Sequence, residues 1–271
     1  IGVRLVGSEM CIRDSFIEAL LKTGRYQFVC LGGAIQHKDY SPQRVEPYGD
    51  DWRIFPIDGY GNHEIIRSIL QKEKPDALWF MTDPRFFGWL WEIENEIRAQ
   101  IPMIYYHVWD NFPSPHFNGI FYRSTDEVVC ISKVTHKILQ DVAPEVSSCY
   151  LPHAVNPEFF HVAKTPEEKS HVETVRNRIL ESTINHKNPN KKIFIWNNRN
   201  ARRKQSGTLI WWFKEFLDEV GHDKATLLMH TDARDQHGQD LPHLIEHLGV
   251  NDGQILLSTQ KVEPQHLANM Y

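Results

Sequence analysis

Residues 192–220 read KIFIWNNRNARRKQSGTLIWWFKEFLDEV, which is a short apolar run, a basic loop and a longer helical pattern. The first run, 192–196, has the length and the β-branched and aromatic content of a buried strand. Ser206 is a suitable N-cap for a helix over 208–220. Because a strand that passes through a short loop into a helix is the first half of a βαβ unit, the stretch predicts an α/β fold with a parallel sheet.

The same alternation of strand and helix patterns extends along most of the chain. Asn62, Asp83 and Ser132 are each expected to cap a helix, the second with Pro84 at its first position. The expected strands cover residues 26–31, 77–81, 103–106, 127–131, 147–151, 192–196, 226–230 and 254–257. One expected helix runs from Asn62 to about residue 72, a second from Asp83 to about residue 99, and a third starts after Ser132. Further helices are expected over 166–181, 208–220 and 241–248, and a last one begins at 263–264.

Two α/β domains follow from this pattern. The rhythm breaks at prolines 152 and 157 and in the polar segment NHKNPNKK. We therefore expect an N-terminal domain over 16–157, a linker with a helix over 158–190 and a C-terminal domain over 191–271. The second domain has few strands and stops inside an expected helix, so we expect it to be incomplete.

Residues 4–15, RLVGSEMCIRDS, resemble the translation of a transposase adapter used in DNA sequencing libraries. Such segments are excluded from fold arguments. We therefore treat residues 1–15 as an adapter artefact and expect the N-terminal domain to lack its first strand. The alternative is that IGVRLVG forms a genuine short strand and turn.

Composition and charge exclude several classes of protein. The 271 residues carry 30 basic and 35 acidic side chains, a net charge of -5, which is not the footprint of a nucleic-acid binder. The mean hydropathy is -0.46, and no apolar run approaches the roughly 20 residues of a membrane span. Beyond residue 15, three cysteines without a CxxC pair, in a chain with no signal peptide, fit a cytoplasmic protein without a zinc site.

The loop behind the strand 192–196 is the strongest candidate for chemistry. Its basic residues are Arg199, Arg202, Arg203 and Lys204. At the carboxyl end of a strand and just before a helix, guanidinium forks, an ammonium group and free backbone N–H groups come together, as a diphosphate requires. The alternative is a solvated basic loop.

Three segments give the chain a specific resemblance. They are LPHAVNPEFF (151–160), WNNRNARRK (196–204) and QILLSTQKVEPQHLANMY (254–271). In this order and spacing they resemble the interdomain, diphosphate and nucleotide-base motifs of GT-B glycosyltransferases, nearest to the retaining enzymes of family 4. The resemblance implies two Rossmann-like domains and transfer of a sugar from a nucleotide-sugar donor, with retention.

The resemblance also implies roles for individual residues. Arg199 and Lys204 match the positions that bind the donor diphosphate; Arg203 competes with Lys204, and Asn198 adjoins them. The turn Lys261-Val262 matches the segment whose backbone meets the base. Such enzymes hold the donor with basic residues, so we expect no metal and no other cofactor.

His107 and Asp110 are the candidates in the N-terminal half. His107 directly follows the strand MIYY, where the family often has a histidine next to the transferred sugar. A neutral ring could donate to a sugar hydroxyl, and a cationic ring would favour developing phosphate charge. The alternatives are a packed or capping histidine and, for Asp110, an Asx turn in place of an acceptor contact.

The acceptor is left open by the sequence: a glycan, a lipid-linked molecule or a small molecule. The aromatic helix FFGWLWE (86–92) indicates core or interface, or else peripheral contact with a membrane surface. The glutamate pair of the family would follow Tyr271, so we expect this fragment to be inactive alone. Two other functions are open: a noncatalytic module for a nucleotide or anionic glycan, and an epimerase or phosphorylase of the same fold.

Overall fold

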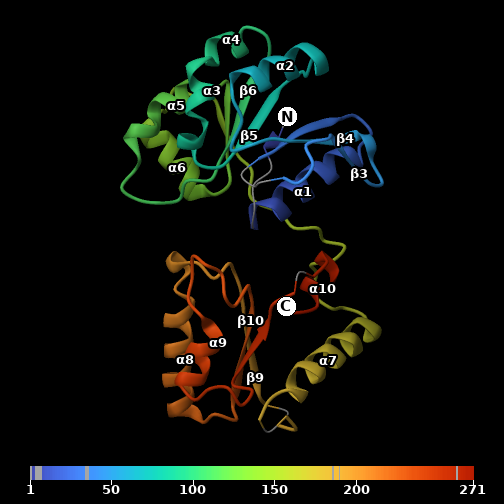
Figure 1. The fold of residues 1–271 in the computed structure, drawn as a ribbon, viewed down its shortest axis with the longest axis vertical. Helices are drawn as coiled ribbons and strands as arrows, with labels where there is room; N and C mark the ends of the chain where they lie inside the picture. Colours follow the sequence, from blue (N-terminus) through green and yellow to red (C-terminus); the bar gives the residue numbers. More distant parts are fainter. Residues whose placement is uncertain (1, 4–7, 34–36, 185, 189, 261) are drawn as a thin grey trace. The chain divides into compact units, whose positions relative to one another are not determined.

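The structure is a computed structural model that describes residues 2–3, 8–33, 37–184, 186–188, 190–260 and 262–271, with only the backbone given before residue 15. The chain forms two compact units, residues 1–155 and 156–271 (Figure 1). The boundary lies within the segment 151–160. The expected linker region, 158–190, lies inside the second unit.

The first unit has two four-stranded sheets, with the orders β1-β2-β4-β3 and β5-β6-β7-β8. All pairs are parallel except β3 with β4. The strands are β1 (Gly2–Val3), β2 (Phe28–Gly32), β3 (Gln43–Val45), β4 (Gly49–Pro56), β5 (Leu78–Met81), β6 (Met103–His107), β7 (Glu127–Cys130) and β8 (Ser148–Tyr150). The helices are α1 (Ser8–Leu21), α2 (His63–Glu73), α3 (Gly88–Glu92), α4 (Glu94–Arg98), α5 (Gly119–Arg123) and α6 (Lys133–Val142), with 3-10 turns at Pro84–Phe87 and His116–Asn118.

Apolar faces of the strands and helices make the core of this unit. The strands contribute Phe80, Tyr105 and Val128, and α2 and α6 contribute Ile66 and Ile138, all almost fully buried. The core fixes the carboxyl ends of β5 and β6 next to each other, because these strands pair in register from Leu78 with Met103 onward. Side chains that follow the two strands are therefore neighbours.

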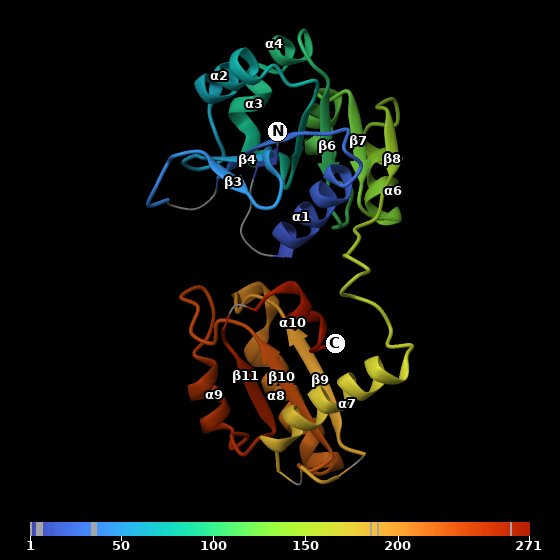
Figure 2. The same ribbon diagram turned by 90° about the vertical axis from the view of Figure 1, so that its right-hand side faces the viewer.

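The second unit is a three-stranded parallel sheet with helices on both faces. Its strands are β9 (Lys192–Asn197), β10 (Ala225–His230) and β11 (Ile255–Ser258), in the order β11-β10-β9. The helices are α7 (Pro166–Glu181), α8 (Ser206–Val220), α9 (Leu241–His247) and α10 (Pro264–Ala268), with a 3-10 turn at Arg202–Lys204. Figure 2 shows α7 in front of the sheet and α8 behind it.

Several expected helix starts are confirmed in atomic detail. The Asn62 side chain accepts from Ile65 N at 2.9 Å, and that of Ser132 accepts from Thr135 N at 3.0 Å. Asp83 accepts from Arg85 N at 3.0 Å, but it begins a 3-10 turn, and the helix expected to reach residue 99 is broken into that turn, α3 and α4. These caps satisfy backbone donors that helix starts leave open.

Three expectations need correction. We expected no strand before Phe16, whereas β1 pairs in parallel with β2. The pair β3 and β4 was not expected, because this polar, turn-rich hairpin lacks the apolar run of a buried strand. Ser206 is the first residue of α8 and not its N-cap, because its hydroxyl donates to Asn200 Oδ1 at 2.6 Å.

Candidate functional site

The basic loop lies at the carboxyl end of β9 and leads into α8. Residue 205, which precedes α8, has a left-handed backbone with φ 57° and provides no side-chain cap. The N–H of Gly207 in the first turn is instead satisfied by Gln239 Oε1 at 2.9 Å. The start of α8 therefore depends on the loop that follows β10, because its cap comes from there.

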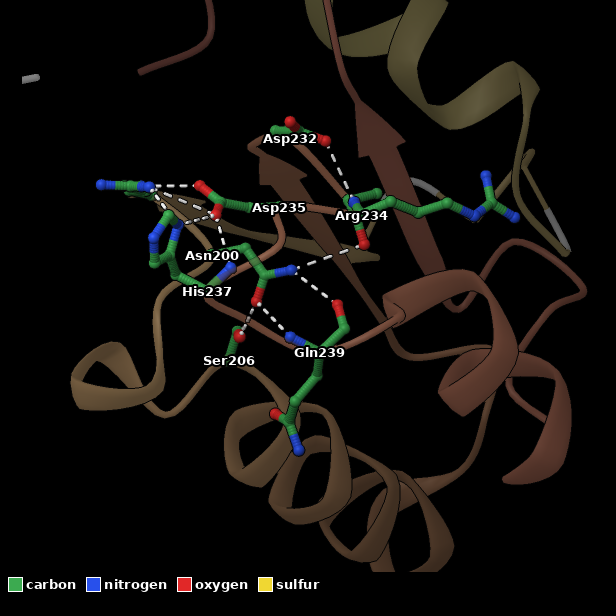
Figure 3. A network of polar contacts seen from close by, with 9 residues as sticks. Asn200, Ser206, Asp232, Arg234, Asp235, His237 and Gln239 are labelled. Carbon is green, nitrogen blue, oxygen red and sulfur yellow. Dashed lines mark hydrogen bonds and ion pairs between the residues drawn. The ribbon is translucent and has the colours of Figure 1, made fainter. Parts of the chain in front are cut away.

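Asn200 joins the two loops. It is fully buried, and its amide nitrogen donates to the carbonyls of Gln239 at 2.7 Å and Ala233 at 3.4 Å (Figure 3). Its amide oxygen accepts from the Ser206 hydroxyl at 2.6 Å and from Gln239 N at 3.3 Å. All the hydrogen-bonding capacity of this side chain is used, so Asn200 fixes the backbone of the basic loop.

Gly238 allows the close approach of the two loops. A Cβ atom at this position would lie 2.1 Å from the carbonyl oxygen of Asn200 and 2.5 Å from its side chain. The backbone of Arg202 adds a hydrogen bond from its N–H to the carbonyl of His237 at 3.1 Å. Only glycine fits between the loops without displacing one of them.

Arg199 is held by an ion pair with the second loop. Its Nε donates to Asp235 Oδ2 at 2.6 Å, and one terminal nitrogen donates to Asp235 Oδ1 at 3.2 Å. The same terminal nitrogen lies 2.8 Å from Nδ1 of His237. Hydrogen bonds from Arg199 and from the backbone of His237 lower the pKa of Asp235 far below its usual range, so this carboxylate is charged at neutral pH.

The other cations of the loop are not neutralised in this way. Arg202 and Arg203 are exposed and Lys204 is half-buried. Among the side chains that the structure describes, none forms an ion pair with these three. The carboxyl end of β9 therefore presents positive charge beside the first turn of α8, the arrangement that binds phosphate groups at helix N-termini.

The structure describes two of the three remaining candidates for donor binding. Asn198 is half-exposed directly behind β9, next to Arg199. Val262 is half-exposed just before α10, whereas Lys261 lies outside the described residues. Asn197, at the end of β9, donates to the hydroxyl of Tyr271 at 3.2 Å, so the C-terminal segment reaches the same edge of the sheet.

His107 is fully buried at the end of β6. Its Nε2 lies 2.8 Å from the hydroxyl of Tyr122, and its Nδ1 has no partner among the described residues. Burial lowers the pKa of His107 to about 3, so the ring is neutral at physiological pH. Of the two chemical roles considered for His107, only the neutral hydrogen-bonding role agrees with this environment.

The loop behind β6 carries Asp110 on the surface. Asp110 is exposed, and among the described residues its side chain has neither a capping hydrogen bond nor an ion pair. On the neighbouring strand end, Thr82 has φ 101°, a strained conformation for a β-branched residue, and its carbonyl accepts from the hydroxyl of Tyr105 at 2.7 Å. Strain of this kind concentrates at functional sites.

The aromatic segment 86–92 contributes to the packing of the first unit. In the aromatic segment 86–92, Phe87 and Leu90 are buried in the core, and Phe86 stacks on Tyr60 with ring centroids 4.5 Å apart.

Within the described part of the chain, no group of three His, Cys, Asp or Glu side chains could hold a metal ion. None of the described helices is both long enough and apolar enough to span a bilayer.

Sequence reasoning missed the partners of the basic loop. Asp235, His237 and Gln239 follow β10, whose carboxyl end adjoins that of β9 because His230 pairs with Asn197. Parallel order places the two loops at one edge of the sheet. The signal was thus available in the segment HTDARDQHGQDL, but it required knowing that β9 and β10 are neighbours.

Solved structures resemble this chain closely in fold and weakly in sequence. No protein-family model matches the chain, and no curated protein matches its sequence. A trehalose-6-phosphate protein from E. coli bound with UDP-2-fluoro glucose has a TM-score of 0.62 and 11% identity, over 99% of this chain and 75% of the other. A glycosyltransferase from Rickettsia africae has a TM-score of 0.62 and 17% identity, over 99% and 69%.

A third structure agrees with these two. It is an alpha,alpha-trehalose 6-phosphate synthase from Burkholderia multivorans, with a TM-score of 0.61 and 13% identity, over 98% of this chain and 73% of the other. At such low identity the likeness establishes the arrangement of the chain and not its chemistry. The chain therefore has the GT-B fold of two Rossmann-like domains that its sequence motifs indicate.

Proposed function

We propose that the chain belongs to a glycosyltransferase that takes a sugar from a nucleotide-sugar donor, with retention, and that it binds the donor diphosphate at the loop between β9 and α8. One observation carries the proposal: Arg202, Arg203 and Lys204 stand without ion-pair partners among the described residues, at the end of β9 and beside the first turn of α8. The fold supports the same class, since one neighbour was solved with UDP-2-fluoro glucose.

The chemistry expected of this loop is stabilisation of a leaving diphosphate. Charge that develops on a departing phosphate is stabilised by cations and backbone donors already in position. The bonds of Asn200 and the close contact at Gly238 supply that preorganisation, because they fix the loop backbone through contacts within the protein itself. The cations of the loop can supply the stabilising charge, so we predict that no metal takes part in the reaction.

On the first unit, we propose that His107 contacts the sugar through Nδ1 and that Asp110 contacts the acceptor. The unpartnered Nδ1 of the neutral ring has a hydrogen-bonding capacity that a hydroxyl group could satisfy. Because the ring is fully buried, this contact requires local opening of the residues that cover it. The exposed carboxylate of Asp110 has no competing ion pair among the described residues. The acceptor class, the cytoplasmic location, contact with a membrane and the inactivity of this fragment alone remain predictions.

Calorimetric titration of the 271-residue chain with UDP and with inorganic pyrophosphate tests the donor site. We expect Arg203→Ala and Lys204→Ala each to weaken binding by on the order of tenfold, as for other hydrogen bonds to charged groups. Lys192→Ala is the matched control, because it removes one exposed cation at the opposite end of β9. Equal affinities in all variants, or no binding to the wild-type chain, would refute the diphosphate site.

Donor consumption separates the proposed function from its alternatives. Transfer requires UDP-sugar and acceptor together, epimerisation requires the donor alone, and a binding module consumes neither. The measurements are release of UDP from UDP-glucose and the identity of the UDP-sugar that remains, each with and without glucose 6-phosphate, in the longest available form of the protein. Conversion without any acceptor would favour an epimerase over a transferase.

A further inference from the structure

We propose that Asp235 is a positioning residue for Arg199, and that it holds the guanidinium in the orientation in which its remaining N–H groups meet a diphosphate. The inference rests on the proposed donor site and deepens it. Asp235 lies on the loop between β10 and α9, and it would not touch the phosphates itself. Its role is to act through Arg199.

The geometry of the pair supports this assignment. Asp235 accepts through both oxygens from Nε and one terminal nitrogen of Arg199, a bidentate arrangement that fixes the plane of the guanidinium. The Asp235 side chain is 11% exposed whereas that of Arg199 is 59% exposed, so the acid is the anchored member and the base the accessible one. The second terminal nitrogen of Arg199 has no hydrogen bond to any described residue, so it is available to a ligand.

His237 strengthens the orientation. Its backbone N–H donates to Asp235 Oδ1 at 2.8 Å, which fixes the carboxylate. Its ring Nδ1 lies 2.8 Å from a terminal nitrogen of Arg199 and 3.1 Å from Asp235 Oδ1. It accepts from Arg199 when it carries no proton and donates to Asp235 when it carries one. In either protonation state the ring adds a contact to one member of the pair, so Arg199 and Asp235 are held more firmly than an isolated surface ion pair.

The charge of Asp235 and its positioning of Arg199 should change the affinity for pyrophosphate in opposite directions. Asp235 is an anion near a site for anions. If it contributed only its charge, neutralising it would strengthen the binding of pyrophosphate, because repulsion would fall. If it positions Arg199, neutralising it must weaken binding although a negative charge has been removed.

The loop offers a matched pair of variants. Asp235→Asn keeps the oxygen that accepts from His237 N and places an NH2 group opposite Nε of Arg199, donor against donor. Asp232→Asn removes the same charge three residues earlier and keeps the oxygen that accepts from Arg234 N at 3.0 Å (Figure 3). Asp232 has no hydrogen bond with Arg199 among the described contacts. Both variants preserve the local turn, so a difference between them reports on Arg199.

The experiment is titration of wild type, Asp235→Asn, Asp232→Asn and Arg199→Ala with inorganic pyrophosphate, together with NMR of the arginine Nε–H groups. We expect Asp235→Asn to bind on the order of tenfold more weakly and Asp232→Asn to bind as well as wild type or up to about twofold more tightly. The Arg199 Nε–H signal should be protected from exchange in wild type and Asp232→Asn and lose protection in Asp235→Asn. A merely structural role of Asp235 would not move this signal while the fold is intact.

Unchanged or tighter binding by Asp235→Asn, with weaker binding by Arg199→Ala, would overturn the positioning role and leave the donor site standing. If Arg199→Ala also binds like wild type, Arg199 has no part in diphosphate binding, and both its assignment to the donor site and the role of Asp235 fail. Full retention of the protected Nε–H signal in Asp235→Asn would equally contradict the proposal. The outcomes thus separate the failure of one inference from that of the other.

Discussion

Buried His107 should make the stability of the first unit fall as the pH is lowered. Burial lowers the pKa of this ring from 6.5 to about 3 in the folded protein, whereas an unfolded chain has the ordinary value. Between these values the unfolded state binds more protons than the folded state, so acid favours unfolding. The stabilisation is present above pH 6.5 and is lost progressively as the pH falls towards 3.

The magnitude follows from the two pKa values. From pH 7 to pH 5 the unfolded histidine becomes almost fully protonated while the folded one stays neutral, which costs about 2 kcal/mol of the free energy of unfolding. His107 is fully buried, so solvent screening does not reduce this figure substantially. Carboxylates of the unit add their own pH dependence, and a comparison of variants removes it.

The assay is amide hydrogen exchange of β6 and β7 at pH 7 and pH 5, corrected for the intrinsic exchange rate, in wild type and His107→Gln. We expect the loss of protection between the two pH values to be smaller in the variant by about 2 kcal/mol. The same substitution at exposed His116 controls for removal of a histidine from this unit. Equal losses in wild type and His107→Gln, or an NMR titration of the His107 ring with a midpoint near 6.5, would refute the reasoning.

Three further substitutions test other parts of the structure. Thr82→Gly should raise the free energy of unfolding by about 1 kcal/mol, because glycine relieves the strain of φ 101°; a lower urea midpoint would contradict this. Gly238→Ala should lower it by about 1–3 kcal/mol and weaken pyrophosphate binding. Gly88→Ala, whose Cβ meets nothing within 4 Å at the start of α3, should neither lower the free energy of unfolding nor change binding. Asn62→Ala should cost about 1 kcal/mol through loss of the α2 cap, and Asn62→Ser should restore most of it in thermal unfolding.

Helices and strands that are marked by a single local pattern, an apolar run or a capping residue, are predicted well from the sequence. The apolar runs of β5 to β10 and the caps at Asn62 and Ser132 are read from neighbouring residues alone, and the structure confirms them. The hairpin β3–β4 was missed because its stability depends on pairing with β2, which no local pattern shows. The helix from Asp83 was predicted as continuous because Phe87 and Ile93, where the backbone leaves helical angles, are apolar residues that fit a helical pattern.

In the candidate site, too, the local sequence predicts some features, whereas others depend on tertiary packing. The position of Arg199 behind a strand could be predicted from the sequence, but its neutralisation by Asp235 could not, since the two residues are on different loops. Likewise, His107 was correctly placed at a strand end, while its burial and its contact with Tyr122 depend on how helices cover that edge. Charge and spacing therefore predict which residues can bind, and packing decides how each of them is held.

The basic loop combines a rigid backbone with unneutralised charge, and this combination argues for a ligand more strongly than either property alone. A loop needed only for structure has no reason to keep cations without partners, because ion pairs with nearby acids would reduce their repulsion. Here the second loop does supply an acid to the basic loop, since Asp235 pairs with Arg199, yet Arg203 and Lys204 have no ion pair among the described residues. Asn200 and Gly238 meanwhile fix the backbone from which these cations project. A site whose backbone is ordered before binding loses little conformational entropy when an anion arrives, which is the condition for stabilising charge that appears only during a reaction.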